Sequence, residues 1–127
     1  MKNLASAGPE PGPGCGLKAA GGRVLARLGD RIIATSDQAL VMTDGLGGAD
    51  IFIPADDLHI AGVAPGRRAL LMEGIGVGFT LDVRVGEEQY PDVAWTVPCP
   101  GPEVAEILGH VAFDPAQVDI TVLSRAA

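Results

Sequence analysis

The chain has 127 residues, a net charge of −7 at pH 7 and a pI near 4.6. This length suits one domain with a modest core, and 47% hydrophobic but only 4% aromatic residues predict a core of Val, Ile, Leu and Ala. Nucleic-acid-binding domains carry basic patches, whereas Arg67-Arg68 is the only adjacent basic pair here, so we expect no nucleic-acid partner. No apolar run is long enough to span a bilayer, and the N-terminus lacks the apolar segment of a signal peptide. We therefore expect no membrane contact and a cytoplasmic location.

Residues 1–22 are dominated by Gly, Pro and Ala. A segment of this composition buries little apolar surface, and ordering it costs much conformational entropy. We therefore predict a flexible Gly/Pro-rich tail over 1–22 and a single mainly-β domain over 23–127.

Short runs of alternating apolar residues follow the tail and are separated by turn residues. Alternation with period two is typical of strands that bury one face. The runs indicate strands at 24–28, 31–35, 39–42, 51–54, 69–72, 77–85, 93–97, 110–113 and 118–122. Hairpin turns are expected at Gly29-Asp30 and at 86–89, and a further turn is expected at 64–67. Because strands outnumber helices and no βαβ rhythm is present, we predict two antiparallel sheets in a sandwich-like or open barrel-like arrangement.

One short α-helix is predicted near the C-terminus. A proline-rich bend at 98–102 ends the preceding strand, and Pro102 suits the first position of a helix. Val104, Ile107 and Leu108 then lie at i, i+3 and i+4 and form one apolar stripe. We expect this stripe to cover the apolar surface at one end of the sheet.

Several short motifs follow one another in a fixed order along the chain. They are Phe52-Ile53-Pro54-x-x-Asp57, Ala94-Trp95, Pro98-x-Pro100-x-Pro102-Glu103, Ile107-x-Gly109-x-Val111-Ala112-Phe113 and Val118-Asp119. In order and spacing they resemble the domain of unknown function 427 family, a set of small bacterial and fungal proteins, over about residues 24–122. The resemblance implies a mainly antiparallel β fold and implies no particular activity.

The chain departs from the family pattern in one segment. The family typically carries Cys-Pro-Tyr-Lys-Gly, whereas this chain has Met72-Glu73-Gly74-Ile75-Gly76 at that place, and Val97 replaces the usual Tyr after Trp95. If the family's Cys and Lys carry chemistry, this chain has lost it.

A compact polar cluster of Asp56, Asp57 and His59 follows Pro54. A carboxylate near an imidazole can orient a general base or hold a metal. We take Asp57 and His59, together with Glu73, as candidate catalytic residues around a pocket near Trp95. The alternative is that one aspartate caps a turn and His59 is exposed. No further ligand stands at a metal-binding spacing, and the chain has no C-x-x-C pair, so no metal ligands are assigned.

Three residues are candidates for ligand binding. Trp95 supplies a large apolar area, either in the core or at the mouth of a pocket. Gly76 belongs to Gly74-x-Gly76-x-Gly78, which precedes a strand and not the helix that a dinucleotide-binding loop requires, yet its missing side chain could leave room for a ligand. Arg68 could receive an anion, although such an arginine is more often part of a solvated turn.

Cys99 lies between prolines, and His110 follows the predicted helix that begins just after it. A Cys-His pair can form a nucleophilic site, so this pair is a further candidate. The family motif has no cysteine at this position, which argues against an essential role.

The missing catalytic signature favours a non-enzymatic module that binds a small ligand or a protein, with no assigned cofactor. The alternatives are a small hydrolase or transferase that uses the carboxylates and His59, and a divalent-metal binder that uses the same groups. We also predict a homodimer formed through an exposed strand edge or apolar strip, because antiparallel edges need covering.

Overall fold

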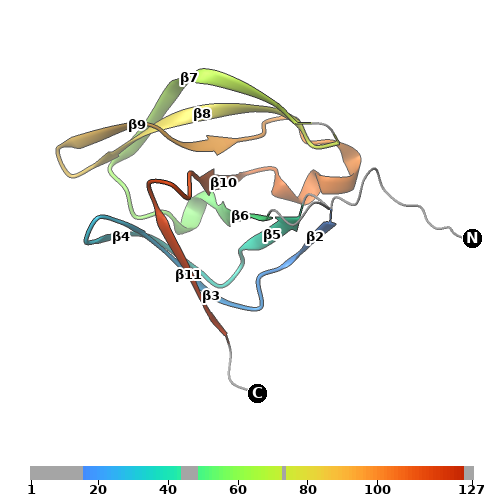
Figure 1. The fold of residues 1–127 in the computed structure, drawn as a ribbon, viewed down its shortest axis with the longest axis horizontal. Helices are drawn as coiled ribbons and strands as arrows, with labels where there is room; N and C mark the ends of the chain where they lie inside the picture. The colour runs from blue at the N-terminus through green and yellow to red at the C-terminus, as the bar shows by residue number, and fades with distance from the viewer. Residues whose placement is uncertain (1–15, 44–48, 73, 125–127) are drawn as a thin grey trace, which may run out of the picture.

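The structure is a computed structural model that describes residues 16–43, 49–72 and 74–124 (Figure 1). It is mainly β, as predicted. Its elements in chain order are β2 (Gly16–Ala19), β3 (Gly22–Leu28), β4 (Arg31–Ser36), β5 (Leu40–Thr43), β6 (Ala49–Pro54), the 3₁₀ segment η1 (Ala55–Asp57), β7 (Gly62–Met72), β8 (Gly76–Val85), β9 (Glu88–Thr96), the 3₁₀ segment η2 (Pro102–Ile107), β10 (His110–Phe113) and β11 (Asp119–Ser124).

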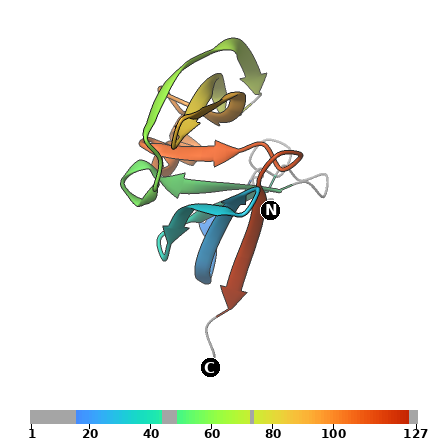
Figure 2. The ribbon, with the colours of Figure 1, turned by 90° about the vertical axis from the view of Figure 1, so that its left-hand side faces the viewer.

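The strands form two antiparallel sheets, which confirms the mainly-β, two-sheet part of the predicted fold class. Within the described ranges, the larger sheet has seven strands in the order β2-β5-β6-β10-β9-β8-β7, and the smaller has three in the order β11-β3-β4. Figures 1 and 2 show the small sheet on one side of the central strands β6 and β10, with β7, β8 and β9 curling over on the other side. Among the strands that the structure describes, β2 and β7 are therefore the two outermost of the larger sheet.

Two apolar clusters hold the fold together. The larger cluster lies between the sheets, because it joins Val24 of β3 and Ile33 of β4 to Ile53, Val83 and Phe113 of the larger sheet. The smaller cluster contains Phe52 and Ala112 from the central strands together with Val104 and Ile107 of η2. Alternating burial along β3, where Val24, Ala26 and Leu28 are buried, follows from the period-two pattern of its sequence.

The predicted α-helix near the C-terminus is wrong. Residues Pro102–Ile107 form a 3₁₀ segment that is interrupted at Val104, whose φ of −126° and ψ of 28° are not helical. Val104 and Ile107 are buried, whereas Leu108 is 60% exposed. A spacing of three residues matches one 3₁₀ turn, and a segment this short gains too few α-helical hydrogen bonds to offset the cost of nucleation.

The apolar residues that alternate along β8 are buried in the larger cluster only in the C-terminal half of the strand. Val83 and Val85 are buried in the larger cluster, but Val77 is 44% and Phe79 is 47% exposed. The pairing of β8 with β9 is irregular between Leu81 and Val83. The alternation of apolar residues at 77–85 therefore does not bury one face throughout, because the larger cluster includes Val83 and Val85 but not Val77 and Phe79.

Two predicted boundaries also differ from the structure. Residues 1–15 of the predicted tail lie outside the described residues, whereas Gly16–Ala19 forms β2 and pairs with β5. The turn expected at 64–67 lies inside β7, where the pairing with β8 is irregular between Pro65 and Ala69. The proline and glycine there distort the strand without ending it, as is usual at a bulge.

Candidate functional site

Trp95 lies on β9 with its indole partly exposed. Its ring meets the ring of Phe52 edge to face, with centroids 5.0 Å apart. The backbone of Gly78 passes beside the indole, since a Cβ at Gly78 would lie 3.3 Å from Trp95 Cε3. One side of the ring is thus held by apolar packing against the smaller cluster, and the rest is left at the surface.

Trp95 lines a hollow of about 190 Å³, which we call the Trp95 hollow. Three neighbouring strands supply its wall: Arg68 is on β7, Thr80 is on β8, and Trp95 lies directly opposite Thr80 on β9. The complete lining is Arg68, Leu70, Thr80, Asp92, Trp95, Asp114 and Pro115. The structure therefore brings Trp95 and Arg68, two residues predicted to bind a ligand, to one place.

The irregularity of β7 positions Arg68 at this hollow. The backbone N–H of Arg67 donates to Asp92 Oδ1 at 3.0 Å, and the N–H of Arg68 donates to Thr80 Oγ1 at 3.0 Å. A Cβ at Gly66 would collide with Thr80 Oγ1 and Asp92 Oδ1. Glycine at position 66 therefore allows the distorted strand to approach β8 and β9 closely enough for both bonds.

Thr80 and Asp92 are at the centre of this hydrogen-bond network. Thr80 is buried, and its hydroxyl donates to Asp92 Oδ1 at 2.5 Å. The N–H of Asp92 donates in turn to Asp82 Oδ1 at 2.8 Å. Asp92 has a φ of 51°, in the left-handed region that aspartate tolerates better than most residues.

Both carboxylates that line the hollow have a pKa below the ordinary aspartate value. The hydroxyl of Thr80, followed by the N–H of Arg67, lowers the pKa of Asp92. The side-chain amide of Gln117, followed by the N–H of Ala116, lowers the pKa of Asp114. Each carboxylate is therefore ionised at neutral pH and already accepts hydrogen bonds from the protein.

Asp57 and His59 lie together in a different hollow of about 440 Å³, which we call the Asp57 hollow. Ser36 Oγ donates to Asp57 Oδ2 at 2.6 Å and accepts from the N–H of Gln38 at 3.0 Å. Ser36 is only 3% exposed, so these bonds tie η1 to β4. The rim of the hollow also carries an ion pair, in which Arg23 Nε lies 3.0 Å from Asp37 Oδ1.

Of the remaining predicted site residues, Gly76 lines neither hollow. Glu73 lies outside the described residues. Gly76 has a φ of +133°, and a Cβ there would lie 2.9 Å from the carbonyl oxygen of Cys99. This glycine therefore serves close packing against the proline-rich bend.

The Cys99-His110 pair does not form in this structure. Cys99 is exposed, and His110 Nδ1 contacts the carbonyl oxygen of Leu108 at 3.1 Å. Among the described residues, no group of three or more His, Cys, Asp or Glu side chains is placed to hold a metal ion. No helix in the described ranges has the length and apolar character needed to cross a membrane.

A comparison with protein families gives one match. The model of the family described as a domain of unknown function (DUF427) matches residues 17–124, which run from β2 to the end of β11. The chain belongs to the DUF427 family. This confirms the resemblance seen in the sequence. A search of curated proteins gives no match.

The sequence did not reveal the three other polar residues that line the Trp95 hollow in this DUF427 protein. Thr80 and Asp92 stand inside strands, and Asp114 stands directly before Pro115 between β10 and β11. Asp92 joins β7 to β9 across β8, and such a long-range contact leaves no local pattern in the sequence. The one available signal was Pro91-Asp92 directly before the predicted strand at 93–97, because proline is rare in a regular inner strand.

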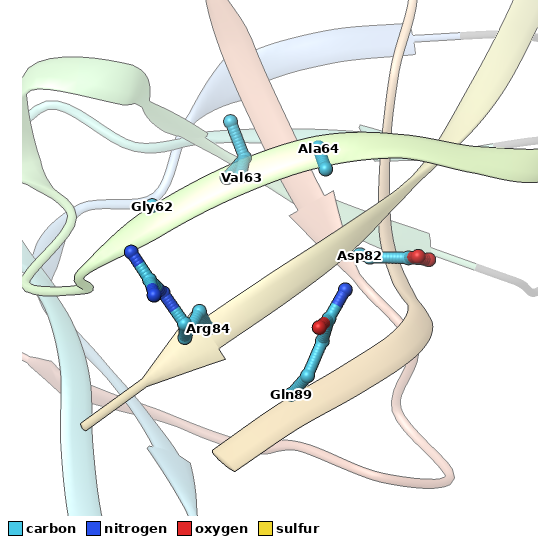
Figure 3. Close-up of a pocket in the computed structure, with 6 residues that line it drawn as sticks. All are labelled: Gly62, Val63, Ala64, Asp82, Arg84 and Gln89. Atoms are coloured by element: carbon cyan, nitrogen blue, oxygen red, sulfur yellow. The ribbon is translucent and has the colours of Figure 1, made fainter. Parts of the chain in front are cut away.

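A third hollow of about 240 Å³ lies on the β7–β8–β9 end of the DUF427 fold (Figure 3). Its lining is Gly62, Val63, Ala64, Asp82, Arg84 and Gln89. In Figure 3 the Arg84 side chain reaches toward Gly62, while Asp82 points away from it. None of the residues predicted from the sequence to form a site lies in this hollow, so Arg84 provides a control position for tests of the Trp95 hollow.

Proposed function

We propose that this DUF427 protein is a non-enzymatic binding module. Its Trp95 hollow receives a small ligand or a single side chain of a partner protein. The observation that carries the proposal is the cross-strand row of Arg68, Thr80 and Trp95, which places a guanidinium and an indole in one hollow. An indole with one free side and a nearby charged donor is a common arrangement in sites that hold a ring with a polar substituent.

The lining indicates the chemistry of the ligand. Trp95, Leu70 and Pro115 offer an apolar wall. The Arg68 guanidinium makes no ion pair within 4 Å and no side-chain hydrogen bond among the described residues, so its donors are free for a ligand. A volume of about 190 Å³ is below the ~300–1,000 Å³ of pockets for drug-sized molecules. The hollow therefore fits a small ring that carries a hydrogen-bond acceptor.

The polar groups of the hollow are arranged for structure more than for catalysis. The Thr80 hydroxyl is buried and engaged with Asp92 and with the N–H of Arg68. A general acid or base works best with a pKa near the operating pH, whereas the pKa of Asp92 and that of Asp114 are lowered. This combination supports binding without a reaction.

An enzyme remains the alternative, and it would use the Asp57 hollow. One observation favours it: Asp57 and His59 line the same hollow beside Ser36. The Ser36 hydroxyl, however, donates to Asp57 and not to a histidine, whereas an activated serine needs a general base as its partner. The metal-binding alternative has no supporting cluster among the described residues.

Tryptophan fluorescence tests the proposed function directly. Trp95 is the only tryptophan of the chain, so any change in indole emission on adding a ligand reports this position. We expect small aromatic compounds with carboxylate or carbonyl groups to change the emission saturably. The substitution Arg68→Gln should weaken that binding about tenfold, equivalent to ~1.4 kcal/mol.

The matched control is Arg84→Gln, which alters an arginine of the neighbouring strand outside the Trp95 hollow. This variant should bind the same compounds as the wild-type protein. The proposal is contradicted if no compound changes the emission, or if the two arginine variants lose binding equally.

A further inference from the structure

We infer that the outer edge of β7, which no described strand covers, docks an extended segment of a partner protein, which adds to the larger sheet as one more strand. The segment carries carboxylate side chains on one face and apolar side chains on the other. This inference rests on the proposed binding role of the Trp95 hollow, because Arg68 and Leu70 of β7 line that hollow. It specifies the kind of partner protein whose side chain would enter the hollow.

The backbone of β7 is open to pairing over a defined stretch. β7 is the last strand of the larger sheet, and every second residue of such a strand directs its N–H and C=O groups away from the sheet. Pro65 and the irregular pairing up to Ala69 make the first half of β7 unsuitable for pairing with a further strand. From Ala69 to Met72 the pairing with β8 is regular, so this stretch presents an edge that a new strand can continue.

The two faces beside this edge differ in character. Ala69 pairs with Phe79, and Leu71 pairs with Val77, so these four side chains form an apolar strip on one face. Leu71 is 85%, Val77 44% and Phe79 47% exposed. Arg68 and Leu70 belong to the opposite face, at the Trp95 hollow. A strand added here would place alternate side chains on the apolar strip and beside Arg68.

The charges at the edge indicate what the added strand carries. The chain has a net charge of −7, yet Arg67 and Arg68 stand together on β7. Neither guanidinium makes an ion pair within 4 Å among the described residues. Both arginines act on Asp92, and Arg68 also acts on Asp114, only over a longer distance. A carboxylate on the added strand would find free donors there.

A second copy of the chain is the other candidate occupant of this edge, because the predicted homodimer would form through an exposed strand edge or apolar strip. Pairing β7 with its own copy would bring two further arginines to an edge that already holds Arg67 and Arg68. Like charges placed together oppose association. The charge at the edge therefore favours a different, acidic partner.

The test uses the full chain and two fluorescein-labelled peptides. In one, valine alternates with glutamate; in the other, valine alternates with lysine. Fluorescence anisotropy should show saturable binding of the glutamate peptide only. Leu71→Lys and Arg68→Glu should each weaken binding about tenfold or more, as expected for residues at the centre of an interface.

Leu123→Lys provides the matched control, because Leu123 is a strand residue with 50% exposure on β11 in the other sheet. It should leave peptide binding unchanged. The inference is overturned if the glutamate peptide does not bind, or if both peptides bind alike. It is also overturned if sedimentation shows a wild-type dimer that Leu71→Lys dissociates, because a second copy then occupies the edge. Small aromatic compounds that still change Trp95 emission would show that only the edge inference has failed.

Discussion

Thr80 Oγ1 and Asp92 Oδ1 lie 2.5 Å apart and join β8 to the irregular part of β9. The same carboxylate oxygen accepts the backbone N–H of Arg67 on β7. One aspartate therefore links three neighbouring strands at the edge of the larger sheet. This link holds Arg68 and Trp95 at the two sides of one hollow, and the predictions below test it.

Gly66→Ala should destabilise the protein because the new methyl group would collide with the Thr80 hydroxyl and the Asp92 carboxylate. Overpacking of this kind costs about 1–3 kcal/mol in the free energy of unfolding. Chemical denaturation measures it. Gly62→Ala on the same strand is the control, since a Cβ there meets no atom within 4 Å, and a loss of equal size in both variants would contradict the account.

Asp92 should make stability depend on acid pH. Its pKa in the folded protein is lowered, so its contribution is complete above the unfolded value of about 3.9 and is lost as the pH falls through the folded pKa. Denaturation from pH 7 downward should show a steeper loss below about pH 4 for the wild-type protein than for Asp92→Asn. Asp114 acts in the same direction in both proteins, and parallel curves would contradict the role of Asp92.

Trp95→Ala should remove the packing of the indole beside Gly78 and against Phe52. Because Trp95 is only partly buried, we expect a loss of about 2–3 kcal/mol, below the ~3–5 kcal/mol typical of a fully buried aromatic residue. Trp95→Phe should cost less. Phe79→Ala removes an aromatic side chain that is 47% exposed and should change the melting temperature little. An equal drop in melting temperature for Phe79→Ala and Trp95→Ala would contradict the packing role of Trp95.

Ser36→Ala should lower the free energy of unfolding by about 1–2 kcal/mol. The substitution leaves the Asp57 carboxylate and the N–H of Gln38 without their hydrogen-bond partner. It should not change the binding of small compounds at Trp95. Ser124→Ala, at an exposed position on β11, should be neutral. Loss of ligand binding in Ser36→Ala with normal stability would instead give Ser36 a functional role.

The strands could be predicted well from the sequence because their pattern is local. Alternation along β3 and the hairpin between β8 and β9 both follow from residues close together in the chain. The prediction of an α-helix was wrong because the six residues that begin with Pro102 form only 3₁₀ turns. The strand β2 was missed because its Gly and Ala residues resemble the preceding tail, and pairing with β5 decides its conformation.

The candidate site could be predicted only in part. Trp95 and Arg68 were identified by residue type, but nothing in the sequence placed the two side chains beside each other. Their meeting depends on the β7–β8–β9 register and on Asp92, which are long-range features. Asp57 and His59 are neighbours in the chain and remain neighbours in the structure, yet the fold places them in a different hollow from Trp95.

The most direct test of the central claim is a ligand titration followed by ¹H–¹⁵N NMR. The chain has one tryptophan, so its indole N–H gives a single resonance that identifies the Trp95 hollow. We expect small aromatic acids to shift this resonance together with the backbone amides of Leu70 and Thr80, while the amides of Asp57 and His59 stay in place. Shifts confined to Asp57 and His59, or an indole resonance that no compound moves, would contradict the binding role of the Trp95 hollow.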